Sequence, residues 1–583
     1  MVRPAKIRVD EKNVNRKLVF LLFPIEKSES IYIFAEEKLT NLYLCNMKTC
    51  KALIVSLFLL MSLSAKAEVN IIPQPTRVVE NDGSYIIKPN ATIAYNHKSL
   101  LPAAEYLREK LRPATGYELP LVKGKKADIV LSYNPKSEIA AEGYKLSISG
   151  KGIFIEAADY RGIIHGIASL RQLLPYQIEE STLQPYVTWM VPTVEIEDTP
   201  NFEWRGMMLD PVRHFFTLEE TKRFLDIMTL YKFSKFHWHL VDSQGWRLEV
   251  KQYPLLTDNS GYRDPEGEHW DRRCNEIAKN DNNPRMKVPM TAEFTRVKNG
   301  KLEYGGFYTQ DEVRDLVQYA LVRGIDIVPE FDVPGHSYAA TKCYPWLSCN
   351  NDGRDPICVG KDTSLEFCRN VYKEIFELFP YEYVEIGGDE VNRSAWKTCP
   401  DCQKRIKDQG VKDEAELQSW FTCTMEKYFN ENGKKLIGWD EILEGGVSKS
   451  ATVNWWRGDH TDVVQRSTSG GNEVILCPFT FCYFDYAQDN NTLKTLYTGD
   501  IVPTDLTAEQ LKLIKGMQGN IWCERIPTEA QMQYMVFPRA LALAEKAWTP
   551  NSQQNWEGFY PRLLKHVQRL NTIGVDQRAL VEN

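Results

Sequence analysis

Short apolar runs separated by polar residues open the part of the chain that follows residue 67. The run 144–148 places an apolar side chain at every second position, which is the period of a half-buried strand, and 152–156 is a second short run rich in apolar residues. Between 168 and 174 the apolar residues recur at helical spacing instead. Turn-forming residues at 198–200 then interrupt the pattern. These features predict a small α/β domain over residues 68–197.

From about residue 202 the pattern changes to short apolar runs that alternate with longer amphipathic segments. Three of the amphipathic segments begin with a capping box, at Thr217, Thr309 and Thr507. Strands that alternate with helices in this way predict a parallel (β/α)8 barrel formed by residues 198–583. The eight expected strands lie near 205–210, 235–240, 325–331, 383–388, 435–439, 451–456, 473–477 and 516–522.

Two segments depart from this alternation. Residues 257–306 are polar and rich in Asn, Gly and Arg, which predicts a loop insertion. Residues 341–361 form a second long connection, and we expect both segments to set the depth of any pocket. The chain after Trp548 is too short for another domain and is expected to finish a helix packed on the barrel.

The N-terminal segment carries an export pattern. Basic residues precede an apolar run at 52–63, and a small-x-small triplet at 65–67 follows it, which predicts a signal peptide over residues 47–67. The run is short for a membrane span, so we expect no stable membrane insertion and a periplasmic or secreted location. Residues 1–46 are then interpreted as a non-native upstream extension. The alternative is a membrane-anchored N-terminus that uses the apolar stretches 18–25 and 52–63.

Composition narrows the function classes. The net charge of -7, with no region dominated by basic residues, gives no support to nucleic-acid binding. The 14 Trp and 28 Tyr could fill a large core or stack on the apolar faces of sugar rings, and only their positions can decide between the two. Nothing in the composition indicates an oligomeric state.

Cysteine usage leaves the redox chemistry open. Cys45 and Cys50 precede the expected cleavage site, so 11 of the 13 cysteines remain in the exported chain, and this odd number leaves at least one thiol unpaired. Cys399 and Cys402 have the spacing of a zinc half-site, but no second CxxC or HxxxH pair accompanies them. A local disulfide or two ordinary thiols is therefore favoured, and neither a metal nor a cofactor is expected.

Acids and tryptophans recur where the eight expected strands end. Functional groups of a (β/α)8 barrel gather at the C-terminal ends of its strands. A single acid or Trp there is commonly structural, but that interpretation does not account for a whole ring of them. The residues are Asp210, Asp242, Asp332 with His336, Asp389 with Glu390, Trp439 with Asp440 and Glu441, Trp455 with Trp456, Tyr483 with Asp485, and Trp522 with Glu524.

Such a rim suits glycoside hydrolysis, in which one carboxylic acid protonates the leaving oxygen and carboxylates offset the oxocarbenium charge. Neighbours on a strand face opposite ways, so Asp389 and Glu390 can both reach a substrate only where the strand ends. Gly387 and Gly388 permit the required bend. Mutual repulsion would raise one pKa of the pair, as a general acid needs. The plainer alternative is two solvated acids at the start of a helix.

Taken together, these motifs resemble glycoside hydrolase family 20, the β-N-acetylhexosaminidases and chitobiases. The similarity covers about residues 70–550, including the small N-terminal domain typical of the family, and its strength lies in the number and order of the motifs. The segments that carry it are 386–391 (IGGDEV), 204–206 (WRG), 236–240 (FHWHL), 244–247 (QGWR), 334–336 (PGH), 438–441 (GWDE), 483–485 (YFD) and 519–524 (GNIWCE).

The resemblance implies exo-acting, retaining hydrolysis of glycans that end in β-linked N-acetylglucosamine or N-acetylgalactosamine, with the substrate's acetamido oxygen as nucleophile. It makes Glu390 the general acid and then the base, while Asp389 orients the acetamido group and Tyr483 bonds its oxygen. The other implied binding residues are Trp439, Trp456 and Trp522 as walls, Arg205 and Glu524 for ring hydroxyls, Asp485 for outer hydroxyls, and Asp332 with His336 as a support pair near the acid.

One residue departs from this pattern, and one pair of histidines needs a separate interpretation. The family usually has His two residues before the Gly-Gly pair, where this chain has Glu385. By strand parity Glu385 faces the same side as Asp389, and we expect it to bond an Arg, a His or a backbone donor, with activity retained. His237 and His239 share a strand face but lack a third ligand at useful spacing, which favours a structural role.

Other functions stay open at this point. One is a relative with shifted specificity, such as a chitobiase or an enzyme that releases a disaccharide or a sulfated sugar. Another is a glycan-binding protein that has lost catalysis, which Glu385 favours and the retained Asp389, Glu390 and Tyr483 argue against. A dehydrogenase is disfavoured because no Gly-rich phosphate loop opens a βαβ unit.

Overall fold

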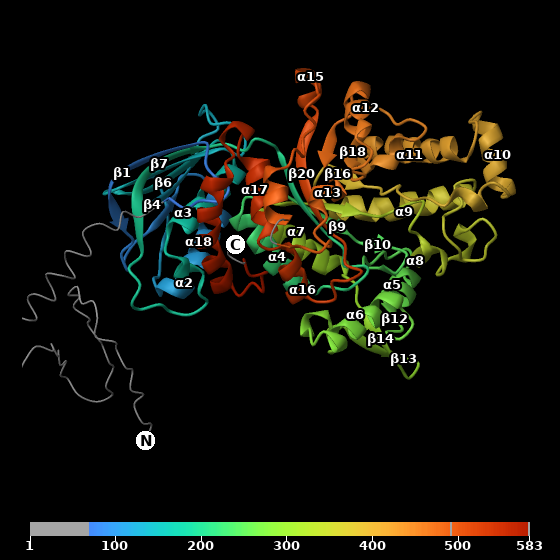
Figure 1. The fold of residues 1–583 in the computed structure, drawn as a ribbon, viewed down its shortest axis with the longest axis horizontal. Helices are drawn as coiled ribbons and strands as arrows, with labels where there is room; N and C mark the ends of the chain where they lie inside the picture. The colour runs from blue at the N-terminus through green and yellow to red at the C-terminus, as the bar shows by residue number, and fades with distance from the viewer. Residues whose placement is uncertain (1–68, 490–491, 581–583) are drawn as a thin grey trace, which may run out of the picture. The chain divides into compact units, whose positions relative to one another are not determined.

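The computed structural model describes residues 69–489 and 492–580 (Figure 1). The expected upstream extension, 1–46, and the expected signal peptide, 47–67, lie outside the described residues. Within the described ranges, every helix is too short or too polar to pass through a bilayer.

A seven-stranded mixed sheet forms the N-terminal part of the described chain. Its strand order is β1-β7-β5-β6-β4-β2-β3, and β5 buries every second residue, as its sequence pattern predicts. The two long helices of this part are α2 (Leu101–Thr115) and α3 (Tyr160–Leu173), and the sheet with these helices confirms the predicted small α/β domain. The strands are β1 (Arg77–Ile86), β2 (Ile93–Tyr95), β3 (Leu121–Lys123), β4 (Ile129–Tyr133), β5 (Tyr144–Ser149), β6 (Gly152–Ala157) and β7 (Met190–Asp198).

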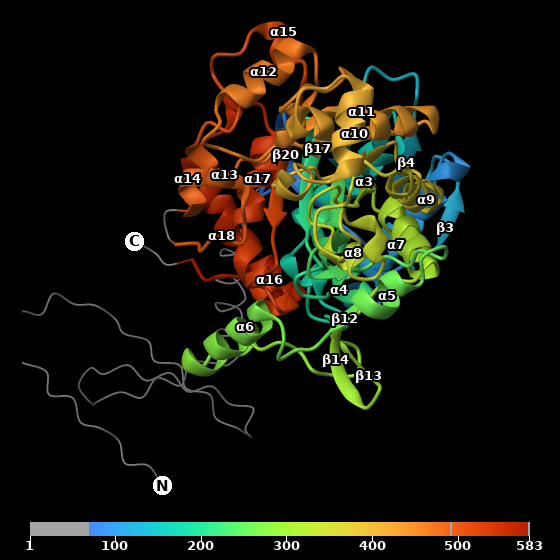
Figure 2. The same ribbon diagram turned by 90° about the vertical axis from the view of Figure 1, so that its right-hand side faces the viewer.

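Eight parallel strands then close into a barrel, in the order β8-β9-β15-β16-β17-β18-β19-β20 (Figure 2). Each strand falls at one of the eight expected positions, so the predicted (β/α)8 barrel is confirmed. The strands are β8 (Trp204–Leu209), β9 (Lys235–His239), β15 (Asp326–Glu330), β16 (Tyr383–Glu385), β17 (Lys435–Trp439), β18 (Thr452–Trp455), β19 (Val474–Leu476) and β20 (Ile514–Ile521).

Helices and turns surround the barrel, and the three predicted capping boxes at Thr217, Thr309 and Thr507 are all formed. The helices are α4 (Leu218–Leu230), α7 (Gln310–Val322), α8 (Tyr338–Thr341), α9 (Asp362–Leu378), α10 (Pro400–Gln409), α11 (Glu414–Glu431), α12 (Asp462–Gly470), α13 (Phe479–Cys482), α14 (Thr492–Thr498), α15 (Ala508–Leu511), α16 (Glu529–Val536), α17 (Arg539–Trp548) and α18 (Trp556–Ile573). The 3-10 turns are η1 (Lys98–Leu100), η2 (Tyr176–Glu179), η3 (Pro284–Met286), η4 (Pro345–Leu347), η5 (Arg393–Ala395), η6 (Asp440–Leu443) and η7 (Asn551–Gln553).

The insertion at 257–306 is structured, which corrects the expectation of a loop. It contains the helix α6 and a three-stranded sheet, and both views show these elements projecting beyond the barrel (Figures 1 and 2). Trp270, Cys274 and Ile277 recur at helical spacing in α6, so the sequence held a periodic signal that the polar composition of the insertion obscured. The elements here and just before are β10 (Val241–Asp242), β11 (Gly245–Trp246), α5 (Leu255–Ser260), β12 (Tyr262–Arg263), α6 (His269–Asn280), β13 (Thr295–Lys298) and β14 (Lys301–Gly305).

The N-terminal sheet meets the barrel through α3 and a set of buried charges. Every residue of α3 from 162 to 173 is buried, because the helix packs against β5 and β6 on one side and the barrel helix α4 on the other. The Lys232 Nζ lies 2.7 Å from Asp198 Oδ2, and both side chains are fully buried. Arg205, near the start of β8, pairs with Glu142 of the N-terminal part. This junction therefore lies at the end of the barrel opposite to the strand C-termini.

Candidate active site

A cavity of about 530 Å³ opens at the C-terminal ends of the barrel strands. Its size is that of a small-molecule site, and its wall combines aromatic rings with several acids and few apolar side chains. The lining residues are Arg213, Trp270, His336, Asp389, Glu390, Trp439, Trp456, Tyr483, Asp485, Tyr486, Ala487, Trp522, Glu524 and Arg525.

Two glycines turn the chain at the end of β16. Gly387 has φ +73° and Gly388 has φ +90°, a region that favours glycine. The Gly388 N–H donates to Asp332 Oδ1 (3.1 Å), and the Gln418 side-chain amide donates to Gly388 O (2.7 Å). Asp332 is itself buried and does not line the cavity. Asp332 lies behind the turn and holds the turn in place through its hydrogen bond with Gly388.

The turn delivers Asp389 and Glu390 to the same cavity, although the two are neighbours in sequence. Asp389 is 9% exposed, whereas 60% of the Glu390 side chain is exposed. His336 Nε2 lies 3.5 Å from Asp389 Oδ2 and 3.5 Å from Glu390 Oε2. The other ring nitrogen of His336 lies 3.0 Å from Asp242 Oδ1. His336 thus connects both acids of the pair to a buried carboxylate.

These contacts separate the pKa values of the pair. Burial raises the pKa of Asp389, with nearby carboxylates adding to the effect and His336 opposing it. Contact with His336 holds the pKa of Glu390 below its ordinary value. Burial alone would lower the pKa of His336, but Asp242 and Asp389 raise it well above its usual range, so the imidazole is a cation. The raised carboxyl pKa is therefore that of Asp389, the buried member, and not that of the exposed Glu390.

Four aromatic side chains form the opposite walls. The rings of Trp456 and Tyr483 are stacked, with centroids 6.2 Å apart and planes at 22°. The rings of Trp439 and Trp522 lie 5.8 Å apart. Burial raises the pKa of Tyr483 well above its ordinary value, so the phenol keeps its proton and can donate a hydrogen bond. Trp455, next to Trp456, bonds Arg457 O (3.0 Å) and does not line the cavity.

Buried acids hold the indole rings of Trp439 and Trp456 by hydrogen bonds. The Trp439 indole N–H donates to Glu330 Oε1 (2.9 Å), and the Trp456 indole N–H donates to Glu441 Oε2 (2.9 Å). Burial, with Asp389 and Asp440 nearby, raises the pKa of Glu441 to about 8. Each ring is consequently held in one orientation before any ligand enters.

Arg213 lines the cavity, and Arg205 does not. The guanidinium of Arg213 pairs with Asp210 (2.9 Å), contacts Asp242 and lies over the Trp522 ring, 5.1 Å from its centroid. Arg205 instead donates to the backbone oxygens of Phe202 and Lys232 near the start of β8. The assignment of Arg205 to ring hydroxyls is therefore wrong. The position of each arginine relative to the strand distinguishes them, because cavity residues follow the end of a barrel strand and Arg205 lies near the start of β8.

Glu524 and Asp485 complete the polar side of the cavity. Arg213 lies 3.8 Å from Glu524, whose pKa burial nevertheless raises. Burial, with Glu524 nearby, raises the pKa of Asp485 to about 7. Within the described part of the chain, Asp485 Oδ1 is buried and has no hydrogen-bond partner. An oxygen of this kind is available to accept a hydrogen bond from a ligand.

Glu385 lacks the partner that the sequence predicted. Among the described residues, none forms a hydrogen bond with either carboxyl oxygen of Glu385. Burial, with Glu330 and Asp389 nearby, raises the pKa of Glu385 well above its ordinary value, and the approach of Asn454 and the Gly387 N–H offsets this only in part. The expectation of a bonded Glu385 is thus corrected: the side chain avoids the cost of a buried charge by staying protonated.

Glu330 has the partners that Glu385 lacks. His237 Nε2 lies 2.8 Å from Glu330 Oε2, and His239 Nδ1 contacts the same oxygen. The charges of the two imidazoles lower the pKa of Glu330, although burial acts in the opposite direction. Both histidines are fully buried, so they hold a carboxylate that in turn holds Trp439.

The two segments expected to border the cavity differ in what they supply. Trp270 of α6, in the insertion, lines the cavity, and the Arg525 guanidinium lies 5.6 Å from the centre of its ring. Trp270 was not among the residues predicted from the sequence, where it stands as an aromatic residue within a polar insertion. None of the described residues 341–361 lines the cavity, so this segment does not border it directly.

Acids and His336 in and behind the cavity lie close enough to hold a cation, in the groups Asp242–Asp332–His336 and His336–Asp389–Glu390. A metal ion would have to displace the proton from His336, whose pKa Asp242 and Asp389 raise. Asp242 is also engaged by Arg213. The donor set therefore favours an ion pair over a metal ion.

Comparison with known proteins gives one consistent family. Residues 202–551 match "Glycosyl hydrolase family 20, catalytic domain", and residues 68–199 match "Glycosyl hydrolase family 20, domain 2". The chain is 35% identical to the β-hexosaminidase of Porphyromonas gingivalis over 563 residues, which cover 91% of this chain and 68% of that protein. It is 32% identical to the β-hexosaminidase of Vibrio furnissii, with 82% and 76% covered.

Solved structures agree with the sequence relatives. The exo β-N-acetylglucosaminidase of Vibrio harveyi, in complex with N-acetylglucosamine, has a TM-score of 0.74 and 31% identity, with 88% of this chain and 79% of that chain covered. The β-N-acetylhexosaminidase of Bacteroides fragilis has a TM-score of 0.72 and 28% identity, with 88% and 97% covered.

Proposed function

The chain belongs to glycosyl hydrolase family 20, and we propose that the residues around its cavity carry out substrate-assisted, retaining removal of terminal β-linked N-acetylglucosamine or N-acetylgalactosamine. The observation that carries the residue assignment is Asp389. Its Oδ1 atom is buried at the cavity wall and lacks a hydrogen-bond partner among the described residues. An acetamido N–H supplies the donor that this oxygen needs.

In the first step the acetamido oxygen attacks C1 of the sugar while the bond from C1 to the leaving oxygen breaks. Glu390 transfers its proton to that oxygen. Asp389 accepts the acetamido N–H and stabilises the positive oxazolinium ring, and the Tyr483 hydroxyl donates to the acetamido oxygen. In the second step Glu390 takes a proton from a water molecule, and this water attacks C1 and opens the oxazolinium ring. The β configuration is therefore retained.

In the free enzyme the pKa shifts of the pair oppose these roles, because the pKa of Glu390 is lowered and that of Asp389 is raised, so substrate binding has to change them. In the free enzyme the exposed Glu390 is held at a lowered pKa by His336. A sugar in the cavity would cover Glu390 and exclude water, which raises a carboxyl pKa and favours the protonated acid. Asp389 and the cationic His336 stay paired, so Asp389 is ready to be a carboxylate when positive charge develops beside it.

The remaining lining residues hold the sugar. Trp439, Trp456 and Trp522 supply aromatic faces for the acetamido methyl and the pyranose ring. Arg213 takes the place first assigned to Arg205 and binds ring hydroxyls together with Glu524. Asp485 accepts from the outer hydroxyls. His336 and Asp332 position the acid pair, Asp332 through the Gly388 N–H.

The site of action is proposed to lie outside the cytoplasm, in the periplasm or beyond the cell. The basic, apolar and small-residue pattern of 47–67 supports this proposal. Measuring the N-terminal residue of the mature protein tests it directly: cleavage after Ala67 supports export, and an intact leader on an active cytoplasmic protein contradicts it.

The test of the catalytic proposal compares a chromogenic β-N-acetylglucosaminide with the matching β-glucoside. Turnover of the first alone supports a required acetamido group and the roles of Asp389 and Tyr483. Comparable turnover of both contradicts substrate assistance. Turnover of neither by a folded protein would favour an enzyme for longer glycans or a binding protein.

A further inference from the structure

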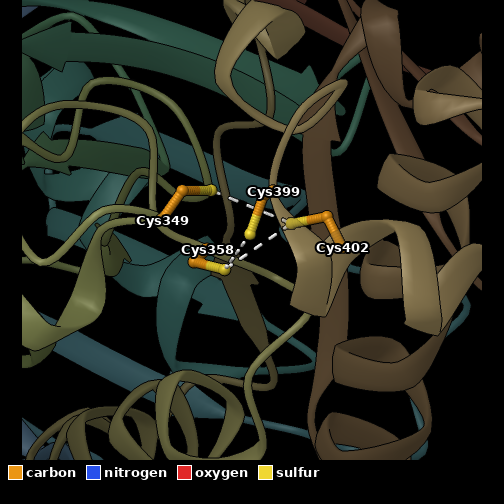
Figure 3. Close-up of side chains that lie close together, drawn as sticks. All are labelled: Cys349, Cys358, Cys399 and Cys402. Carbon is orange, nitrogen blue, oxygen red and sulfur yellow. Dashed lines mark hydrogen bonds between the residues drawn. The ribbon is translucent and has the colours of Figure 1, made fainter.

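Four cysteine side chains from two separate connections of the barrel meet in one cluster (Figure 3). Cys349 and Cys358 lie between β15 and α9, while Cys399 and Cys402 lie after β16, at the start of α10. The Sγ of Cys402 is 3.8 Å from that of Cys349 and 3.5 Å from that of Cys358. The Sγ of Cys358 is also 3.6 Å from that of Cys399. All four sulfurs lie within 4.8 Å of one another.

These separations have the size of the edges of a metal–thiolate tetrahedron. Zinc binds thiolate sulfur at about 2.3 Å, and tetrahedral geometry then places two sulfurs about 3.8 Å apart. We propose that Cys349, Cys358, Cys399 and Cys402 bind one zinc ion as a structural site. Four protein ligands leave no open position for water or substrate, and none of the cysteines lines the catalytic cavity.

The sequence offered half of this site. Cys399 and Cys402 were recognised as a CxxC pair without a second half-site, and a disulfide or two ordinary thiols was favoured instead. The second half is the pair Cys349 and Cys358, whose nine-residue separation does not resemble a zinc motif. The fold supplies the missing proximity, because the connections that follow neighbouring barrel strands emerge side by side.

The backbone of both loops is shaped around the cysteines. Cys358 N–H donates to Leu347 O (2.7 Å), and Ser348 pairs with Ile357 in a short antiparallel bridge, which brings Cys349 and Cys358 to the base of one hairpin. Gly360 approaches α10 so closely that a Cβ there would be 2.3 Å from Cys402 N. The two loops therefore converge on one point, as a metal site with ligands from both of them requires.

Charge and burial also suit a thiolate-bound cation. Cys358, Cys399 and Cys402 are at most 1% exposed, and Cys349 is half-buried. Four thiolates and one zinc ion carry a net charge of about -2, which positive groups must offset. The Lys361 ammonium bonds Ser348 O (2.6 Å), and the Arg405 guanidinium bonds Gly360 O (3.1 Å) while it also pairs with Asp362. The positive end of the α10 dipole points to the same place.

The ion would join the loop that carries His336 to the loop that carries Asp389 and Glu390. Ile357 N–H donates to Pro334 O (3.0 Å), two residues before His336. From the other loop, the Trp396 indole N–H donates to Ile357 O (3.1 Å). Zinc would therefore act as a positioning element, since it fixes the spacing of two segments that place the acid pair against His336.

Metal analysis of the purified full chain tests the proposal. After dialysis against metal-free buffer, we expect about one zinc per chain, and replacement by Co²⁺ should give the visible absorption of a tetrahedral thiolate complex. Mercurial modification of the thiols should release the zinc. Two disulfides linking the four cysteines, shown by mass spectrometry under non-reducing conditions, would overturn the proposal. So would four free thiols in a chain that takes up no zinc.

Substitutions of single cysteines give a second test of the zinc site. Cys349→Ser should weaken zinc binding at least tenfold, while Cys349→His should retain the ion because imidazole can replace a thiolate. Cys423→Ser is the matched control, since Cys423 is also a half-buried free cysteine but lies on α11, outside the cluster. Cys349→Ser that holds zinc as tightly as the Cys423→Ser control would overturn the proposal. If Cys349→Ser fails to fold, the zinc content of the unmodified chain decides.

Discussion

A Cβ atom built on Gly387 would lie 1.9 Å from Asp332 Oδ1. The same carboxylate oxygen accepts a hydrogen bond from the next residue, Gly388. The bend that presents Asp389 and Glu390 to the cavity thus depends on the absence of one side chain and on the position of another. Asp332 influences the acid pair without touching the cavity itself.

Gly387→Ala tests this contact. We expect a loss of more than about 100-fold in kcat/KM, because the Cβ must displace Asp332 and the turn that orients both acids. Gly433→Ala is the control, since Gly433 has φ +70° but no atom within 4 Å of its Cβ position, so it carries only the backbone strain of about 1–2 kcal/mol. Equal loss of activity in the two variants would contradict the role of the Asp332 contact.

Glu390→Gln should slow hydrolysis by an amount that depends on the leaving group. Glutamine cannot protonate the departing oxygen, so a sugar leaving group should suffer a loss of about 10²–10⁴-fold, while an activated nitrophenolate should suffer far less in the first step. Burst kinetics with the activated substrate would then show a slow second step. A uniform loss for both leaving groups would argue against the acid role.

Substitutions of Arg213 and Arg205 should separate an effect on sugar binding from an effect on folding stability. Arg213→Met should lower kcat/KM for the N-acetylglucosaminide by roughly 10–100-fold, since it removes charged hydrogen bonds to the sugar. Arg205→Met should leave KM close to that of the unmodified enzyme but lower the free energy of unfolding by about 3–5 kcal/mol, because Glu142 loses its buried partner. Enzyme assays and urea unfolding of both variants provide the comparison. A raised KM for Arg205→Met would restore the first assignment.

Glu385→Gln should change how stability depends on pH. The folded chain keeps Glu385 protonated above about pH 4.3, where the unfolded chain has released that proton, so the free energy of unfolding falls as pH rises, by up to about 1.4 kcal/mol per pH unit. Glutamine has no proton to release, so this contribution should be absent in the variant. Urea unfolding between pH 4 and pH 8 measures the difference.

The control for this measurement is Glu366→Gln, an exposed position on α9 that should follow the unmodified curve. Activity of Glu385→Gln at neutral pH should stay within about threefold, because a neutral side chain replaces a neutral one. A Glu385→Gln curve parallel to that of the unmodified protein would show that Glu385 is ionised in the folded chain.

Trp270→Ala should affect long substrates more than short ones. Trp270 reaches the cavity from the insertion, so it is placed to contact the part of a glycan beyond the terminal sugar. We expect KM to rise about tenfold for an N-acetylglucosamine disaccharide, in line with the loss of one aromatic contact, and to change little for the chromogenic monosaccharide. Equal changes for both substrates would place Trp270 against the terminal sugar instead.

The barrel could be predicted because apolar runs, helix periodicity and capping boxes are local properties of the sequence. The rim was predictable for the same reason, since each strand end is marked by its own motif. The predictions that were wrong concern features that are not set by a local pattern. Arg205 and Arg213 lie eight positions apart, and only the strand boundary tells which one reaches the cavity. The surroundings of Glu385, which give it no hydrogen-bond partner among the described residues, and the meeting of Cys349 with Cys402 depend on contacts between distant segments, which no local pattern encodes.

The buried charges beneath the barrel have a consequence for how this protein can evolve. Lys232 and Arg205 of the barrel pair with Asp198 and Glu142 of the N-terminal part, whereas Lys235 pairs with Asp326 inside the barrel. A barrel without the N-terminal part would leave Lys232 and Arg205 without these counter-charges. An evolutionary change in the N-terminal part must therefore keep acids at these two positions, or the matching cations of the barrel must change with them.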